Sequence, residues 1–101
     1  MTAIMHVVLV AFAPDATATQ RDGIRDALRR LPETVPGILD LAEGPSVSPE
    51  GLEDGFDFGF TMRFASPADR DAYLAHPDHQ RFGGSLGALA ARIAVFDLAV
   101  R

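Results

Sequence analysis

Four stretches of the chain carry the apolar patterns of β-strands. They cover residues 3–12, 38–43, 56–64 and 93–100. In the stretch 56–64, apolar residues alternate with polar or small ones, so that one face of this strand is expected to pack against a core. The first and last stretches are apolar on both faces, which indicates that both faces of these strands are buried against other parts of the native assembly.

The segments between the strands have the pattern of helices, in which apolar residues recur every three or four positions. In the first helix, Thr19 is the expected N-cap and Pro32 is expected to end the helix. The second helix begins after Ser66, its expected N-cap. A third helix runs from Pro77 to about residue 92, and His76 is expected to help cap it, since a residue before proline avoids the helical conformation.

The predicted order of elements is βαββααβ, in one domain that spans residues 1–101. This order matches a ferredoxin-like α+β fold, which is a four-stranded antiparallel sheet with its helices on one face. The other face of the sheet then stays uncovered, although the first and last strands are apolar there. A large exposed apolar patch is typical of a protein interface, so we expect a homodimer in which two sheets meet face to face.

The composition excludes several kinds of chemistry. The 101 residues include no Cys, Lys, Trp or Asn, which rules out thiolate nucleophiles, disulfides, cysteine metal sites and a Schiff-base lysine. The net charge of −5 and a pI near 4.9 argue against a nucleic-acid partner. No apolar run is long enough to span a bilayer and the first residues lack the features of a signal peptide, so we expect no membrane association and a cytoplasmic location.

Acid–base chemistry near neutral pH is left to the three histidines His6, His76 and His79, helped by Tyr73 or a carboxylate. A metal site is not expected, because His76 and His79 are three residues apart with a proline between them. Metal-binding histidines on a helix are usually four residues apart and share one face. No other cofactor is expected either.

The segment 72–82, with the sequence AYLAHPDHQRF, resembles the signature of the stress-responsive dimeric α/β-barrel family, often shortened to Dabb. The segments 6–12 and 95–97 resemble the first and last strands of the same family. The resemblance covers essentially the whole chain. It implies a ferredoxin-like fold and a homodimer that closes into an α/β barrel.

The resemblance also implies a function, that of the family's plant polyketide cyclases, which close a linear polyketide by an intramolecular aldol step. Their catalytic pair corresponds here to Tyr73 and His79, in a pocket between the sheet and the helices. The residues expected to line this pocket, and so to bind a small apolar or aromatic ligand, are His6, Val8, Phe58, Phe60, Met62, Phe82 and Val95. The chain departs from the cyclase-type members at Phe58, where they have a histidine.

Elementary chemistry supports the same pair. His79 lies in the first turn of the helix that Pro77 opens, where the positive end of the helix dipole favours a neutral imidazole, the form that a general base needs. Tyr73 could hydrogen-bond the oxygen on which enolate charge develops, whereas the Asp78 carboxylate favours a protonated imidazole. Two interpretations stay open. One is a cofactor-independent, cyclase-like or lyase-like enzyme with His79 as base and Tyr73 as oxyanion donor, and the other is a non-catalytic, ligand-binding or stress-protective dimer.

Overall fold

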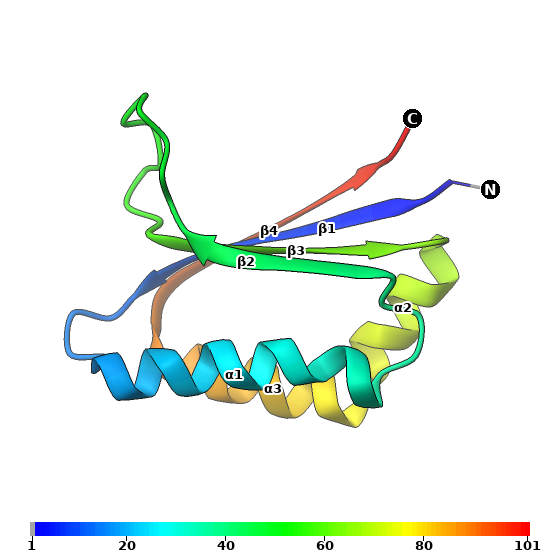
Figure 1. Cartoon of the computed structure of the whole chain (residues 1–101), viewed down its shortest axis with the longest axis horizontal. Helices are drawn as coiled ribbons and strands as arrows, with labels where there is room; N and C mark the ends of the chain where they lie inside the picture. The colour runs from blue at the N-terminus through cyan, green and yellow to red at the C-terminus, as the bar shows by residue number, and fades with distance from the viewer. Residues whose placement is uncertain (1) are drawn as a thin grey trace.

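The computed structural model describes residues 2–101, which form a four-stranded sheet and three helices (Figure 1). The elements, in chain order, are β1 (Ile4–Phe12), α1 (Ala18–Thr34), β2 (Asp40–Pro45), β3 (Phe58–Phe64), α2 (Pro67–Ala75), α3 (Pro77–Leu89) and β4 (Ala90–Ala99). The predicted order βαββααβ is confirmed. Within residues 2–101, no helix has both the length and the apolar character needed to cross a membrane.

All neighbouring strands are antiparallel, in the order β2-β3-β1-β4, which is the ferredoxin-like sheet that the sequence predicts. β1 lies inside the sheet, and β4 forms one edge. The register places His6 of β1 between Met62 of β3 and Asp97 of β4. The first and last strands are therefore paired along their whole length, and Figure 1 shows both termini at the same end of the sheet.

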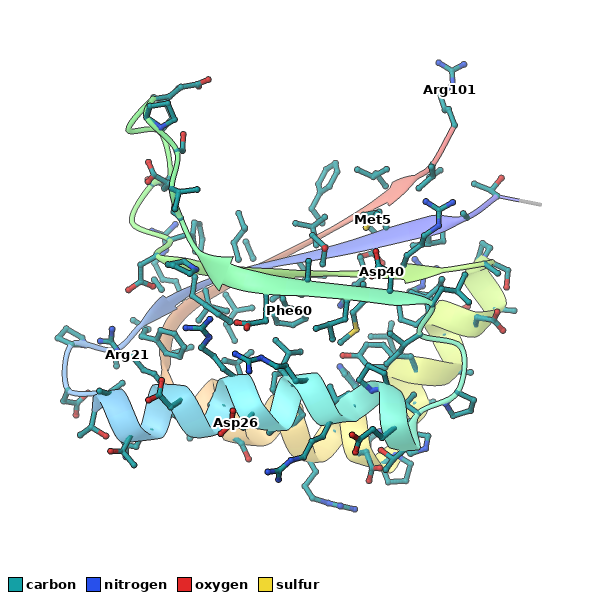
Figure 2. The ribbon with its side chains drawn as sticks, in the orientation of Figure 1. Met5, Arg21, Asp26, Asp40, Phe60 and Arg101 are labelled. Carbon is teal, nitrogen blue, oxygen red and sulfur yellow. The ribbon has the colours of Figure 1, made fainter. Side chains whose placement is uncertain are left out.

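The core lies between the helices and one face of the sheet (Figure 1). Because side chains alternate along a strand, the even-numbered residues of β1 and β3 point toward the helices and are buried. Figure 2 shows both directions, with Phe60 on the helix side and Met5 on the opposite side. The largest fully buried side chains are Tyr73, Phe64, Leu28, Met62 and Val10.

α1 begins earlier than expected, because its N-cap is Thr17 and not Thr19. The Thr17 hydroxyl accepts the backbone N–H of Gln20 at 3.1 Å, and the Gln20 side chain accepts the backbone N–H of Thr17 at 2.9 Å. This reciprocal pair is a capping box, which satisfies two backbone donors at once. Thr19 lies inside the helix, two residues too late to form the capping box.

Pro32 does not end α1, which continues to Thr34. A proline lacks its own N–H, so it removes one hydrogen bond of the helix and leaves the later donors intact. The N–H of Val35 still bonds the Leu31 carbonyl at 2.8 Å. The prediction that Pro32 closes the helix was therefore wrong.

Several other predicted bounds move by two or three residues. β2 covers residues 40–45 in place of 38–43, and β3 begins at Phe58 in place of residue 56. α3 ends at Leu89 and not near residue 92. β4 begins at the next residue, because Ala90 already pairs with Phe12 of β1. The start of β4 is thus determined by its pairing with β1, which is distant in sequence. The local sequence pattern gives no signal of this pairing.

The face of the sheet away from the helices is open, and the loop between β2 and β3 rises on this side (Figure 1). The register of β1 and β4 places apolar side chains of both strands on this face. Three of them are large and well exposed: Leu9 at 40%, Leu98 at 41% and Phe96 at 67%. This is the uncovered apolar face that the sequence predicts.

The capping box gives a direct test of where α1 begins. We expect Thr17→Ala to lower the free energy of unfolding by about 1 kcal/mol, because the backbone N–H of Gln20 loses the hydroxyl that accepts its hydrogen bond. Thr19→Ala is the matched control and should change it by less than about 0.5 kcal/mol. Urea unfolding followed by circular dichroism measures both. A larger loss at Thr19 than at Thr17 would place the cap at the later threonine.

Candidate functional site

A pocket of about 270 Å³ lies between the helices α2 and α3 and the part of the sheet that contains β1 and β4. Its wall combines four polar side chains with an apolar majority. The lining residues are His6, Val8, Phe60, Tyr73, Leu74, His79, Phe82, Gly83, Leu86, Ile93, Val95 and Asp97. The pocket lies on the helix side of the sheet, where the sequence places it.

The break between α2 and α3 brings Tyr73 and His79 together. His76 ends α2 and caps α3, because its Nδ1 accepts the backbone N–H of Asp78 at 3.0 Å. The predicted capping role of His76 is thus confirmed. Pro77 follows at the first position of α3, where its missing N–H costs nothing. Tyr73 in the last turn of α2 and His79 in the first turn of α3 then approach within 4.5 Å between ring centroids.

A backbone hydrogen bond determines which nitrogen of His79 is available for chemistry. His79 Nδ1 lies 2.9 Å from the carbonyl oxygen of Leu74, which can only accept, so Nδ1 carries the proton and donates it. In the neutral ring, Nε2 therefore holds the lone pair. Burial lowers the pKa of His79, the Leu74 carbonyl partly offsets this, and nearby His6 lowers the pKa further. Near neutral pH, His79 is a free base with a fixed tautomer.

Tyr73 supplies a hydrogen-bond donor beside that base. Its side chain is 1% exposed and lines the same pocket as His79. Burial raises the pKa of Tyr73 well above the value of a free tyrosine, because the phenolate would be poorly solvated there. The hydroxyl thus keeps its proton at neutral pH. A buried neutral O–H of this kind can stabilise an oxygen on which negative charge develops.

A second histidine, His6, lines the pocket from β1. Its ring is held by Asp97, which in turn is bound by Arg70. His6 is 3% exposed, and its Nδ1 lies 2.6 Å from Asp97 Oδ1 on the paired strand β4. The other carboxylate oxygen of Asp97 accepts a hydrogen bond from the Arg70 guanidinium at 2.8 Å. The centroids of the His6 and Tyr73 rings are 5.8 Å apart, so both histidine rings lie near the Tyr73 ring.

The residues predicted to bind a ligand divide into two groups. His6, Val8, Phe60, Phe82 and Val95 line the pocket. Phe58 and Met62 share the same face of the sheet but lie outside the pocket wall. Met62 is fully buried in the core, and the Phe58 ring packs 5.6 Å from that of Phe12, with the Arg25 guanidinium 5.8 Å from its centre. Alternation predicts which face of the sheet a side chain lies on. It does not predict how far along the strand the pocket extends.

The predicted list of site residues leaves out six that the structure places at the site: Arg70, Leu74, Gly83, Leu86, Ile93 and Asp97. Leu74 contributes its backbone carbonyl, for which no side-chain pattern gives a signal. Gly83 and Leu86 follow His79 by four and seven residues on α3, so helical spacing could have placed them on the same face. Arg70 contacts Asp97 across 27 positions of sequence, a distance that local patterns do not cover.

Metal-binding groups are not gathered in this pocket. Over residues 2–101, no three His, Asp or Glu side chains lie close enough to hold a metal ion together. The carboxylate of Asp97 is engaged by His6 and Arg70. Among the side chains that line the pocket, those of His79 and Tyr73 can transfer protons and form hydrogen bonds.

The chain is similar to proteins of known sequence along nearly its whole length. Residues 4–100 match the sequence profile of the family described as Stress responsive A/B Barrel Domain. The olivetolic acid cyclase of Cannabis sativa is 23% identical over 99 residues, which cover 98% of each protein.

Solved structures with the same fold include an enzyme and a protein of unknown function. The hydroxynitrile lyase from Passiflora edulis is 21% identical and superposes with a TM-score of 0.92, covering 98% of this chain and 94% of the lyase. A dimeric ferredoxin-like protein from a Jannaschia species is 29% identical, with a TM-score of 0.87 and coverage of 97% and 99%. These similarities agree with the ferredoxin-like sheet and helices described above.

The surroundings of His79 predict its titration. Because burial favours the neutral ring, we expect its pKa to lie below the value of about 6.5 for an exposed histidine. The unfolded chain then binds the proton more tightly, so this group makes folding less favourable as the pH falls through that range. NMR titration of the ring Cε1–H signals measures the pKa, and His79→Gln assigns the signal. A His79 pKa above 6.5 would contradict the effect of burial.

Proposed function

Because the chain belongs to the Stress responsive A/B Barrel Domain family, we propose that it is a cofactor-independent enzyme that removes a proton from the carbon beside a carbonyl group, as an aldol-type cyclase or a lyase does. The substrate would be polyketide-like or aromatic. The observation that carries this proposal is the fixed tautomer of His79, whose free Nε2 shares a pocket with the protonated hydroxyl of Tyr73.

The proposed step moves one proton and one electron pair. His79 Nε2 takes the proton from the α-carbon, and the electron pair of that C–H bond forms the enolate. The Tyr73 hydroxyl donates a hydrogen bond to the enolate oxygen, where the negative charge collects. The enolate carbon attacks a second carbonyl, and the His79 imidazolium returns its proton to the new alkoxide. Leu74 holds the protonated ring throughout, because its carbonyl accepts from Nδ1 in both charge states.

Two relatives with named activities support an enzymatic function, and the one named a cyclase supports this class of reaction. One is named a cyclase and the other a lyase, although each is less than 25% identical to this chain. The resemblance to cyclase-type members also implies a histidine at the place of Phe58. Phe58 here lies outside the pocket, beside Phe12 and Arg25. The proposed step accordingly uses Tyr73 and His79 alone.

Exchange of α-protons tests the proposal without knowledge of the natural substrate. With acetophenone in D₂O at neutral pD, we expect the protein to speed the loss of the methyl proton signal in NMR. His79→Gln should slow this exchange by about 100-fold or more, because the base is removed. Tyr73→Phe should slow it by about 100-fold, because the enolate oxygen loses its donor.

Asp26→Asn, on the exposed outer side of α1, is the control and should keep the wild-type rate (Figure 2). Circular dichroism checks that each variant is folded. If the wild type and all three variants exchange protons at the same rate, the base–donor pair has no catalytic role. The pocket would then serve the alternative function, ligand binding without chemistry.

We also propose that two copies of the chain form a homodimer through the open face of the sheet and close an α/β barrel. The exposed apolar side chains of β1 and β4 support this, because such a surface is stabilised by burial against a partner. The Jannaschia relative, which is described as dimeric, supports it as well. A two-fold interface would pair this face with its own copy.

Sedimentation at micromolar concentration tests the dimer. We expect a mass of twice the 10.8 kDa of one chain for the wild type. Phe96→Glu should shift the protein to the monomer, because a carboxylate would be buried in the interface. Leu39→Glu is the matched control, since Leu39 is 61% exposed but lies on the helix side beside α1, and it should remain dimeric. A wild-type protein that sediments as a monomer would contradict the proposal.

A further inference from the structure

The open face of the sheet, opposite the helices in Figure 1, has a hollow on one side of β1. This hollow has a volume of about 340 Å³ and lies over β2, β3 and β1. Because side chains alternate along each strand, every second residue of these strands faces it. The lining residues that face it are mostly small: Val7, Leu9, Ala42, Gly44, Gly59 and Thr61. The surface is therefore sunken on this side of the sheet.

On the other side of β1, the same face projects. Phe96 of β4 pairs with Val7 of β1 and is 67% exposed, so its ring stands out from the sheet. Val7 pairs in turn with Thr61 of β3, and Thr61 pairs with Ala42 of β2. The projecting ring and the hollow thus lie at the same level of the sheet, on opposite sides of β1.

Gly44, in the hollow, is a glycine that the single chain does not require. Glycine inside a strand lowers stability, because it costs backbone entropy and has no side chain to pack. Its strand partner Gly59 is explained by close neighbours, since a Cβ there would lie 3.3 Å from Leu9 Cδ2 and 3.3 Å from the Val8 carbonyl oxygen. The backbone of Gly44 is not left-handed, and a Cβ there would meet no described atom within 4 Å. A group from outside the chain that approaches the strand closely accounts for Gly44.

The charge of the protein favours this face as the place where two copies meet. Each chain carries a net charge of −5, so two copies repel each other where acidic side chains approach. Of the described strand residues at the levels of Val7 and Leu9, none on the open face is charged. The carboxylate of Glu43 lies on the helix side, where Arg25 donates a hydrogen bond to it at 2.7 Å. A second copy thus meets an uncharged surface at the hollow.

A two-fold axis brings the projecting ring and the hollow together. β1 lies between β3 and β4 in the sheet. An axis that runs along β1 exchanges the two sides of the sheet and leaves each level unchanged. It places the Phe96 ring of each protomer over the hollow of its partner, at the level of the partner's Ala42 and next to the partner's Gly44. The same contact then occurs twice, as in an isologous interface.

We propose that the Phe96 ring of each protomer inserts into the hollow of its partner, against the partner's Gly44. This inference rests on the homodimer proposed above. It adds the contact that determines how the two sheets are oriented on each other. It also assigns a role to Gly44, whose missing side chain leaves room for the ring.

Sedimentation over a range of concentrations measures the dissociation constant of the dimer. We expect Phe96→Ala to raise this constant at least tenfold, because the ring no longer fills the hollow. Gly44→Phe should also raise it at least tenfold, because the introduced ring occupies the space of the partner's ring. Gly84→Phe, at an exposed position of α3, is the matched control and should stay within twofold of the wild type. Circular dichroism checks that each variant is folded.

Co-expression of Phe96→Ala with Gly44→Phe tests whether the two positions touch each other across the interface. In a mixed dimer, the ring introduced at position 44 of one chain meets the space vacated at position 96 of the other. The second contact of the mixed dimer is that of the wild type. We expect native mass spectrometry to show a larger share of mixed dimer than the half that random pairing of equal amounts gives.

The outcomes separate the contact from the other proposals. A dimeric wild type whose dissociation constant is unchanged in both variants overturns the contact, as does a mixed dimer at or below the random share. If Gly44→Phe does not fold, Gly44→Val replaces it, with the same expected directions. A wild type that sediments as a monomer contradicts the homodimer and this contact with it. Absence of α-proton exchange would contradict the proposed enzyme and leave the contact standing.

Discussion

The site depends on one hydrogen bond, from the backbone N–H of Asp78 to Nδ1 of His76. In a continuous helix this N–H would bond the carbonyl of Leu74, four residues earlier. Since His76 takes it, the Leu74 carbonyl is left without a helical partner, and such a carbonyl at a helix end needs a donor from elsewhere. His79 Nδ1 provides that donor at 2.9 Å. The same break that turns the chain thus brings His79 beside Tyr73 and determines which of its nitrogens is free.

The sheet supplies the other polar groups under a different constraint. A histidine that is 3% exposed and an aspartate beside it cost free energy unless each polar atom finds a partner. The antiparallel register places His6 directly opposite Asp97, and Arg70 from α2 binds the second oxygen of that carboxylate. No fully buried side-chain nitrogen or oxygen within residues 2–101 lacks a partner. The hydrogen bonds from His6 and Arg70 to Asp97 therefore hold these polar groups of the pocket in place. The Arg70 guanidinium is engaged by Asp97.

The sequence predicts most of the fold, because strand alternation, helix spacing and proline positions are local signals. The capping role of His76 also follows from local chemistry around one proline, whereas the pairing of Tyr73 with His79 was implied by the family resemblance. Features that depend on distant partners were not predictable in this way. Arg70 meets Asp97 only through the packing of α2 on the sheet, and the pocket opens over β1 and β4 rather than at Phe58. The N-cap at Thr17 was missed for another reason, since the prediction took Thr19, whereas the deciding partner is the side chain of Gln20, three residues after Thr17.

The proposed base and donor and the apolar wall of the pocket come from separate parts of the chain. The base and the donor lie in the segment 73–79, whose geometry is fixed by backbone hydrogen bonds of the helix break. The apolar wall of the pocket is formed by side chains that take no part in those bonds, and two of them, Ile93 and Val95 on the edge strand, are 44% and 60% exposed. Substitutions at such exposed positions usually change stability little. Side chains of this wall can therefore change while the helix break keeps His79 beside Tyr73.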